Sequence, residues 1–381
     1  MRQFFAVFIV ALLLTGCGLR PPEELSMPAL EGEYAEHRIQ RLWARNTGSG
    51  VRKVHLELTP AVTSDSVYVA DHRGRVHARE RDSGSRQWRV STDDRIGTGL
   101  YAGYGMVIYG TRDGEAVALD AEDGSEQWRA TIGSELFSRP AAGSGLVVFQ
   151  TMDGRVVALE RDDGEERWSH DTSLPILILR AGATPVISGN RVFAGFANGR
   201  AVALDADSGA PVWERRVAEP SGRSELERLV DVTGDLILQG NALYAGTFQG
   251  NVMRMDRDSG QPMWERAMSV HAPLAHDGRN LYVADSDGNV LALDQRTGSP
   301  LWRQDRLSER GGLTGVVAHD GHVVTGDSEG WLHWLDAESG RLLMRRQHQP
   351  QGFAATPVER DGVLYVLGRR GWLAAYELHE R

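Results

Sequence analysis

The chain has 381 residues, of which 44 are glycine and one is cysteine, and its formal charge is −10 at pH 7. With 41% hydrophobic and 25% charged residues it has the composition of a globular protein, and a single cysteine excludes a disulfide scaffold. The 52 acidic side chains outnumber the 42 lysines and arginines, and no basic run is present, which argues against a nucleic-acid-binding surface.

Residues 1–16 have the pattern of a signal peptide. An apolar run at residues 4–14 follows a short positive start and is too short to cross a bilayer as a helix. Residues 14–17, Leu-Thr-Gly-Cys, resemble the bacterial lipobox. That resemblance implies cleavage before Cys17 and diacylation of its thiol. Gly18 follows in place of the aspartate that retains many lipoproteins at the inner membrane, so we expect a lipid anchor in the outer membrane, with the protein on the periplasmic face.

Residues 17–36 contain prolines and glutamates without a sustained period, which predicts a lipidated tether. Residues 37–381 are predicted to form one domain. Since Cys17 is the only cysteine and is expected to be lipidated, a thiol-based active site is excluded.

A repeat of about 40 residues runs through this domain. In seven copies a glycine is followed ten residues later by a second glycine and fourteen residues later by a tryptophan, which Met344 replaces in the seventh; an eighth copy begins at Gly371. An acid follows the first glycine by six residues in all eight copies. The tryptophans of the repeat are Trp88, Trp128, Trp168, Trp213, Trp264 and Trp302.

Each copy predicts a four-stranded antiparallel sheet. Residues 146–160 are apolar and β-branched on both sides of Asp153-Gly154, the pattern of a hairpin. The acid-x-x-x-Gly segment predicts a second turn. The segment that ends in the tryptophan predicts the strand that follows this turn. Such a unit buries its faces only against its neighbours, so the repeat predicts a β-propeller.

The chain ends predict how the ring closes. The eighth copy lacks its tryptophan strand, whereas Trp43 lies in a strand-like segment before the first complete copy. Pairing this N-terminal strand with the C-terminal blade gives an all-β, eight-bladed propeller without an open edge.

The repeat resembles the tryptophan-docking motif of quinoprotein-type propellers, as in residues 118–128 (Ala-Leu-Asp-Ala-Glu-Asp-Gly-Ser-Glu-Gln-Trp). The resemblance implies that the indoles, Trp43 included, pack between blades and are structural. It also leaves open a quinone-dependent (PQQ) dehydrogenase. Against that enzyme, the chain is short, lacks an adjacent cysteine pair and shows no asymmetric cluster of acids. We therefore expect no cofactor, no metal and no catalytic residue.

Three local motifs are explained by the repeat. Ser328 lies in a G-x-S-x-G sequence, but at a hairpin turn rather than the strand-to-helix turn that a nucleophile requires. His319 and His322 lack a second ligand pair for zinc. Asp285 and Asp287 lack the remaining ligands of a calcium loop.

Two adjacent connections between blades are enlarged. The intervals from Trp168 to Pro185 and from Trp213 to Thr233 are 17 and 20 residues, against 12 from Trp128 to Pro140. The first contains five aliphatic side chains between residues 174 and 179, and the second is charged with a possible helical turn. An extended core strand is one interpretation of the apolar segment; a protein-binding rim is the other.

The lipobox, the tether and an eight-bladed propeller together resemble the BamB family of outer-membrane lipoproteins. Residues 174–180, Leu-Pro-Ile-Leu-Ile-Leu-Arg, and 229–232, Leu-Val-Asp-Val, carry the local resemblance. It implies that Leu177, Leu179, Arg180 and Asp231 contact a periplasmic POTRA domain of BamA. Thr233 stands where the family has a second acid, so an acidic contact is not expected there.

The sequence thus predicts a non-enzymatic scaffold of the β-barrel assembly complex, binding BamA and assisting insertion of barrel proteins into the outer membrane. Nascent outer-membrane proteins are possible further partners, through strand addition to the outer strands. Two alternatives remain: a quinone-dependent periplasmic enzyme, and a propeller that binds another envelope protein or a glycan.

Overall fold

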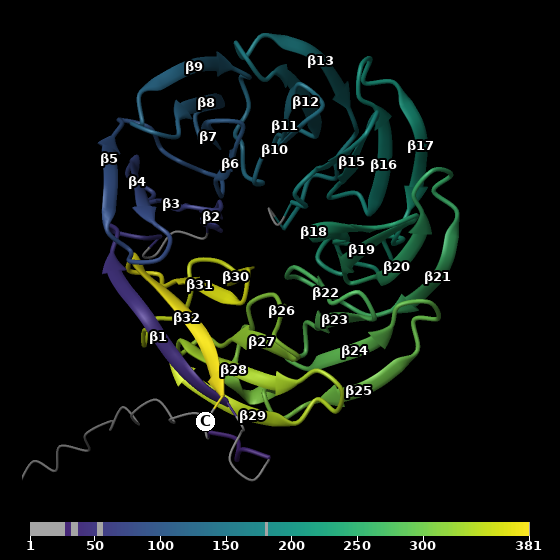
Figure 1. Cartoon of the computed structure of the whole chain (residues 1–381). Helices are drawn as coiled ribbons and strands as arrows, with labels where there is room; N and C mark the ends of the chain where they lie inside the picture. The colour runs from purple at the N-terminus through teal and green to yellow at the C-terminus, as the bar shows by residue number, and fades with distance from the viewer. Residues whose placement is uncertain (1–26, 32–36, 52–55, 180–181, 381) are drawn as a thin grey trace, which may run out of the picture.

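Eight four-stranded antiparallel sheets are arranged as blades around a central axis (Figure 1). The computed structural model describes residues 27–31, 37–51, 56–179 and 182–380. Within blades 1 to 7 the chain runs from the innermost to the outermost strand and then passes to the next blade. This confirms the all-β propeller that the repeat predicted.

The first four blades follow the chain without a crossover. Blade 1 has β2 (Ala61–Val62), β3 (Ser66–Ala70), β4 (Arg75–Glu80) and β5 (Arg86–Ser91). Blade 2 has β6 (Tyr101–Gly103), β7 (Met106–Gly110), β8 (Glu115–Asp120) and β9 (Glu126–Thr131). Blade 3 has β10 (Ala141–Gly143), β11 (Leu146–Gln150), β12 (Arg155–Glu160) and β13 (Glu166–Asp171). Blade 4 has β14 (Val186–Ser188), β15 (Arg191–Gly195), β16 (Arg200–Asp205) and β17 (Pro211–Arg216).

The remaining blades complete the ring, with one short 3-10 helix, η1 (Ser308–Arg310), between blades 6 and 7. Blade 5 has β18 (Asp231–Gln239), β19 (Ala242–Phe248), β20 (Asn251–Asp256) and β21 (Pro262–Ala267). Blade 6 has β22 (Ala275–His276), β23 (Asn280–Ala284), β24 (Val290–Asp294) and β25 (Pro300–Gln304). Blade 7 has β26 (Val317–His319), β27 (His322–Gly326), β28 (Trp331–Asp336) and β29 (Leu342–Gln347). Blade 8 has β30 (Val358–Arg360), β31 (Val363–Leu367), β32 (Trp372–Glu380) and β1 (His37–Asn46).

The N-terminal strand closes the ring as the sequence predicted. β1 pairs antiparallel with β32, from His37 opposite Glu380 to Asn46 opposite Trp372, and the two strands lie side by side in Figure 1. Because strands from both ends of the chain share one sheet, blade 8 cannot form until both ends are in place.

Local turn chemistry explains the repeated glycines and acids. Gly154 has a φ of 93°, a backbone conformation that side-chain-bearing residues rarely adopt, in the turn between β11 and β12. In the next turn of a blade, the Asp205 carboxylate accepts hydrogen bonds from the amides of Asp207 and Ser208, and the Gly209 amide donates to the Asp205 carbonyl at 2.8 Å. Each copy therefore encodes its own hairpins.

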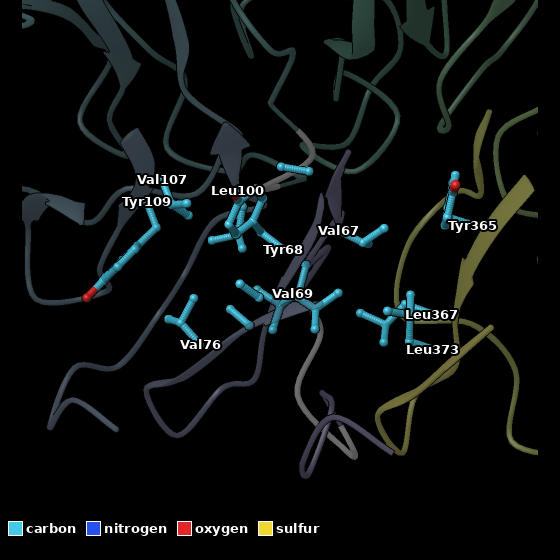
Figure 2. Packing of buried hydrophobic residues seen from close by; sticks show 14 of the residues in the cluster. Val67, Tyr68, Val69, Val76, Leu100, Val107, Tyr109, Tyr365, Leu367 and Leu373 are labelled. Carbon is cyan, nitrogen blue, oxygen red and sulfur yellow. The ribbon is translucent and has the colours of Figure 1, made fainter. Parts of the chain in front are cut away.

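The core lies between neighbouring blades. Figure 2 shows Val67 and Val69 of blade 1 between Val107 of blade 2 and Leu373 of blade 8. The second strand of a blade is buried on both faces, as in β3 and β11, since each blade is covered by two others. A blade therefore has no hydrophobic core of its own.

The repeated tryptophans dock between blades, as predicted. The Trp168 indole lies over Gly209 of the next blade, where an added Cβ would be 2.6 Å from the ring, and its Nε1 donates to the Ala206 carbonyl at 2.7 Å. The same contact with the following blade is made by Trp43, Trp88, Trp128, Trp213, Trp264 and Trp302.

The junction of blades 7 and 8 uses a rearranged version of this contact. In six blades an alanine pairs across the strands with the docking tryptophan, as Ala118 pairs with Trp128. In blade 7 the pair is Trp334 and Met344, so the large ring lies on β28 instead of the outer strand. Trp334 is fully buried, in one cluster with Met344 and Tyr376 of blade 8. An indole thus still fills this junction.

Part of the predicted tether lies against the propeller. The Glu31 amide donates to the Leu342 carbonyl at 2.7 Å, and its carboxylate accepts from Gln304 and from the Leu342 amide. The Pro28 carbonyl accepts from Arg345 at 2.7 Å. Cys17 and the other residues before Met27 lie outside the described residues. Within the described ranges, no helix has the length and hydropathy needed to span a bilayer.

Candidate functional site

The two enlarged connections lie next to each other on the ring. They join blade 3 to blade 4 (residues 172–185) and blade 4 to blade 5 (residues 217–230), and we call residues 172–179 and 217–230 the rim. A groove of about 460 Å³ is bounded by Thr172, Leu174 and Pro175 from the first connection and by Pro220 from the second. The interpretation of two adjacent loops is therefore confirmed.

The first connection presents aliphatic side chains to solvent. Its base is fixed because the Asn198 amide donates to the Ser173 carbonyl at 3.0 Å, while Leu174 turns inward against Gly154. Ile176 is fully exposed and Leu177 is 39% exposed. Leu179 is partly buried. No strand forms over residues 172–179, so the extended-core-strand interpretation is wrong for this segment.

The second connection forms one helical turn stabilised by a capping box. The Glu227 carboxylate accepts from the amides of Arg223 and Ser224, at 2.6 and 3.0 Å, and the Glu227 amide donates to the Ser224 hydroxyl. The bonds from the Arg223 and Ser224 amides lower the pKa of Glu227. The Gln249 side chain holds the turn by donating to the Leu226 carbonyl, and the Leu226 side chain is 66% exposed.

Asp231 lies beneath the rim. It begins β18, pairs with Phe248 and is 2% exposed. Thr233, at the place of the family's second acid, is 1% exposed, and its hydroxyl donates to the Val270 carbonyl at 2.6 Å. Arg180, the fourth predicted contact residue, lies outside the described residues. Of the three predicted contact residues that the structure describes, Leu177 is the most exposed.

Sequence reasoning missed the two most exposed aliphatic residues of the rim, Ile176 and Leu226. Ile176 sits in the same apolar run as Leu177, and the run alone does not show which side chains face outward. For Leu226 a signal was present, because Ser224-x-x-Glu227 is a capping-box pattern that orients the turn.

The other motifs serve turns and strands. The Ser328 hydroxyl donates to the Arg310 carbonyl at 2.8 Å, and Asp285 accepts from the amides of Asp287 and Asn289 within its own turn. His319 and His322 pair across a hairpin and are both buried. Among the described residues, no group of three or more His, Cys, Asp or Glu side chains could hold a metal ion.

A second cavity, of about 330 Å³, lies among the innermost strands at the centre of the ring. Arg139 of blade 3 pairs there with Asp235 of blade 5 at 2.9 Å, and Glu57 and Glu359 line the same space. A quinone cofactor bearing several carboxylates would meet three acids and one arginine that is already paired. The residues present therefore do not fit that cofactor.

Comparison with known proteins gives the family. A family model described as outer membrane protein assembly factor BamB matches residues 72–304 and 286–380. The chain belongs to the BamB family. A BamB from Pseudomonas aeruginosa is 39% identical over 98% of both chains.

Solved structures agree with this assignment. The BamB crystal structure from Moraxella catarrhalis has a TM-score of 0.81 at 25% identity and covers 89% of this chain and 100% of its own. A quinohemoprotein alcohol dehydrogenase from Comamonas testosteroni has a TM-score of 0.71 at 16% identity, covering 89% of this chain and 76% of its own, and so shares the fold alone. The family assignment places this BamB-family chain among assembly factors rather than dehydrogenases.

Proposed function

We propose that this protein is a lipid-anchored scaffold of the outer-membrane β-barrel assembly machinery, and that its rim docks on a periplasmic POTRA domain of BamA. The observation that carries the proposal is the exposure of Ile176, Leu177 and Leu226 on two adjacent, enlarged connections of a BamB-family propeller. Aliphatic side chains that are exposed on neighbouring loops are typical of protein-binding sites.

The surroundings of these side chains support a docking role. Arg216, which pairs with Glu219 at 3.1 Å, and Glu214 border the groove. A polar border of this kind surrounds an apolar anchor in many interfaces. Arg180 remains predicted to pair with a partner carboxylate. Because Asp231 is buried at the base of the second connection, we propose that it supports the rim rather than reaching the partner by itself.

Replacing both Ile176 and Leu177 by aspartate is expected to abolish co-purification of BamA with the tagged protein from detergent-solubilised membranes. The change places two charges where a partner would have to desolvate them, and both positions are exposed in the free protein, so folding should be preserved. Quantitative mass spectrometry of the recovered proteins measures the effect.

The matched control is Tyr104→Asp. Tyr104 is 59% exposed on blade 2, away from the rim, and has a φ of 54°, which aspartate tolerates. Unchanged recovery of BamA with the folded rim variant would remove the rim from the interface. Recovery of a different envelope protein with the wild type, and no BamA, would favour the alternative of another partner.

We further propose that the outer strands receive extended segments of client proteins by strand addition. On each outer strand, one residue immediately precedes the docking tryptophan, or Met344 in blade 7. This residue is apolar in five consecutive blades and polar in the other three, where it is Gln87, Gln127 or Arg167. The apolar residues are Val212, Met263, Leu301, Leu343 and Leu42, in blades 4 to 8. The backbone bond from Glu31 to Leu342 supports the idea, since it lies on the free edge of β29.

The triple variant Val212→Ser, Met263→Ser, Leu301→Ser is expected to bind a synthetic β-strand peptide of an outer-membrane barrel roughly tenfold more weakly, because about half of each side chain is exposed and available for burial. Fluorescence anisotropy measures the affinity. The variant Gln87→Ser, Gln127→Ser, Arg167→Ser changes the equivalent positions of blades 1 to 3 and should bind as the wild type does. Equal loss in both variants would contradict a client surface confined to blades 4 to 8.

A further inference from the structure

Arginine is unevenly distributed over the outer strands of the eight blades. In four consecutive blades, 6, 7, 8 and 1, the outer strand contains no acid: β25 has one arginine, β29 two, β1 three and β5 two. These four strands follow one another along the perimeter in Figure 1, and we call their outer surface the arginine face. The outer strands of blades 2 to 5, which are β9, β13, β17 and β21, each contain glutamate, and their formal charges together are zero.

The charge of the arginine face is not compensated within the protein. Arg41 and Arg86 are exposed, and no arginine of the face forms an ion pair with another described residue. In the opposite half of the ring, by contrast, Arg129 of β9 pairs with Asp94 at 3.0 Å and with Glu126 at 2.7 Å. The positive charge of the arginine face is therefore available to an external anion.

Two of these guanidinium groups flank one buried tyrosine between blades 7 and 8. Arg346 of β29 lies over the Tyr376 ring, with its Cζ 5.8 Å from the ring centroid, and Arg41 of β1 is opposite Tyr376 in the strand register. The Tyr376 hydroxyl is bonded to His348 at 3.0 Å. Guanidinium groups bind phosphate oxygens through several N–H donors, and stacking on an aromatic ring holds such a group in place. This junction therefore presents donors that suit a phosphate group.

The segment that leads to the expected lipid anchor is attached to the same part of the ring. The Glu31 carboxylate accepts from Gln304 of β25, and the Glu31 amide donates to the Leu342 carbonyl of β29, each at 2.7 Å. Ten residues separate Met27, the first described residue, from Cys17. An extended chain of that length spans at most about 35 Å. Acyl chains on Cys17 would therefore hold blades 6 and 7 near the bilayer.

We propose that the arginine face lies on the anionic phospholipid headgroups of the leaflet that carries the acyl anchor, an inference that rests on the lipid anchoring in the proposed function. Lipid phosphates pair with the exposed guanidinium groups. The face also lowers the electrostatic cost of bringing a chain of charge −10 to a negative surface. An acidic protein would match the same charge, but the attached tether favours the membrane because it keeps this face within reach of the bilayer.

This orientation is compatible with the other proposed surfaces. The rim joins blades 3, 4 and 5, on the opposite side of the ring, so it points away from the bilayer and toward a periplasmic domain. At blades 6 to 8 the arginine face adjoins the apolar residues proposed to receive client strands, which places that binding beside the membrane.

Co-sedimentation with vesicles tests the proposal. The protein used is the mature chain, residues 17–381, with Cys17→Ser, so that no acyl chain contributes. We expect saturable binding to vesicles of phosphatidylglycerol and phosphatidylethanolamine, no binding to phosphatidylcholine vesicles, and loss of binding at about 1 M salt, where the Debye length is about 3 Å. The added changes Arg38→Gln, Arg41→Gln and Arg86→Gln, all at exposed positions, should weaken binding about a hundredfold, because each arginine near an anionic surface contributes about fivefold.

The matched control combines Arg167→Gln, Arg216→Gln and Arg266→Gln, which removes three arginines from the outer strands of the opposite half. Both triple variants have the same net charge, so the control should bind vesicles as the parent chain does. Equal weakening in the two variants, absence of binding, or no preference for phosphatidylglycerol over phosphatidylcholine would overturn the proposal. Because the assay contains neither acyl chains nor BamA, such a result would leave anchoring and docking to be judged by their own experiments.

Discussion

Replacing Trp168 by alanine is expected to lower the free energy of unfolding by about 3–5 kcal/mol. The change empties the space between blades 3 and 4 and leaves the Ala206 carbonyl without the indole N–H, which lies 2.7 Å away. Because the indole of one blade covers a turn of the next blade, the substitution weakens the contact between two blades rather than the packing within one blade. Urea denaturation followed by tryptophan-independent circular dichroism measures the difference.

The control for this variant is Trp372→Ala, which removes an indole that is 44% exposed on β32 and should cost much less. Gly209→Ala supplies a complementary variant, since its Cβ would meet the Trp168 ring at 2.6 Å at a φ of 69°. It should therefore destabilise the same junction from the other side. Equal stability losses for Trp168→Ala and Trp372→Ala would show that docking is not what holds the blades together.

Replacing Arg310 by alanine is expected to cost about 3–5 kcal/mol, since it leaves a buried carboxylate without its cation. Arg310 lies in η1 with a fully buried side chain and donates to Asp327 at 2.8 Å; His333 bonds to the same carboxylate oxygen at 2.9 Å. These contacts attach the connection between blades 6 and 7 to blade 7. Arg306→Ala, in the same connection, removes an exposed pair with Glu31 and should cost at most about 1 kcal/mol.

The effect of Arg310→Ala should depend on pH. Burial alone would raise the pKa of Asp327, but the bonds from His333, the Trp331 amide and Arg310 hold it below the usual range. A carboxyl with a lowered pKa stabilises the fold above its unfolded-state pKa and loses that contribution as pH falls through the folded value. The stability difference between wild type and variant should therefore shrink at acid pH. A difference that stays constant down to pH 2, roughly, would indicate that packing of the arginine stem, not its charge, is responsible.

Much of the fold could be predicted because its determinants are local. Hairpin turns need glycine at positive φ and an acid that accepts amide hydrogens, and both stand at fixed offsets, as Asp205 and Gly209 do. The docking of Trp168 on Gly209 follows from the same period, since every copy has its tryptophan and its turn glycine at fixed positions, and consecutive copies form neighbouring blades. In blade 7, Met344 stands at the tryptophan position and Trp334 at the alanine position. The sequence shows both departures from the repeat, but it does not show that the Trp334 ring fills the junction with blade 8.

The candidate sites were predicted less completely. Loop lengths located the rim, yet the exposures of Ile176, Leu177 and Leu226 depend on how each connection folds over its neighbours. The motif containing Asp231 gave no sign that its carboxylate lies under the surface. The central cavity left no signal at all in the sequence.

By itself, therefore, the sequence determined the number of blades, their hairpins, the tryptophan contacts and the closure of the ring by β1, because each rests on spacing within or between adjacent copies. Only the tertiary structure decided which residues meet on the axis. Arg139 and Asp235 are 96 residues apart in the chain, and Glu57, which precedes the first strand of blade 1, lines the same cavity. No local rule links such positions, since their proximity arises only when eight blades close around one centre.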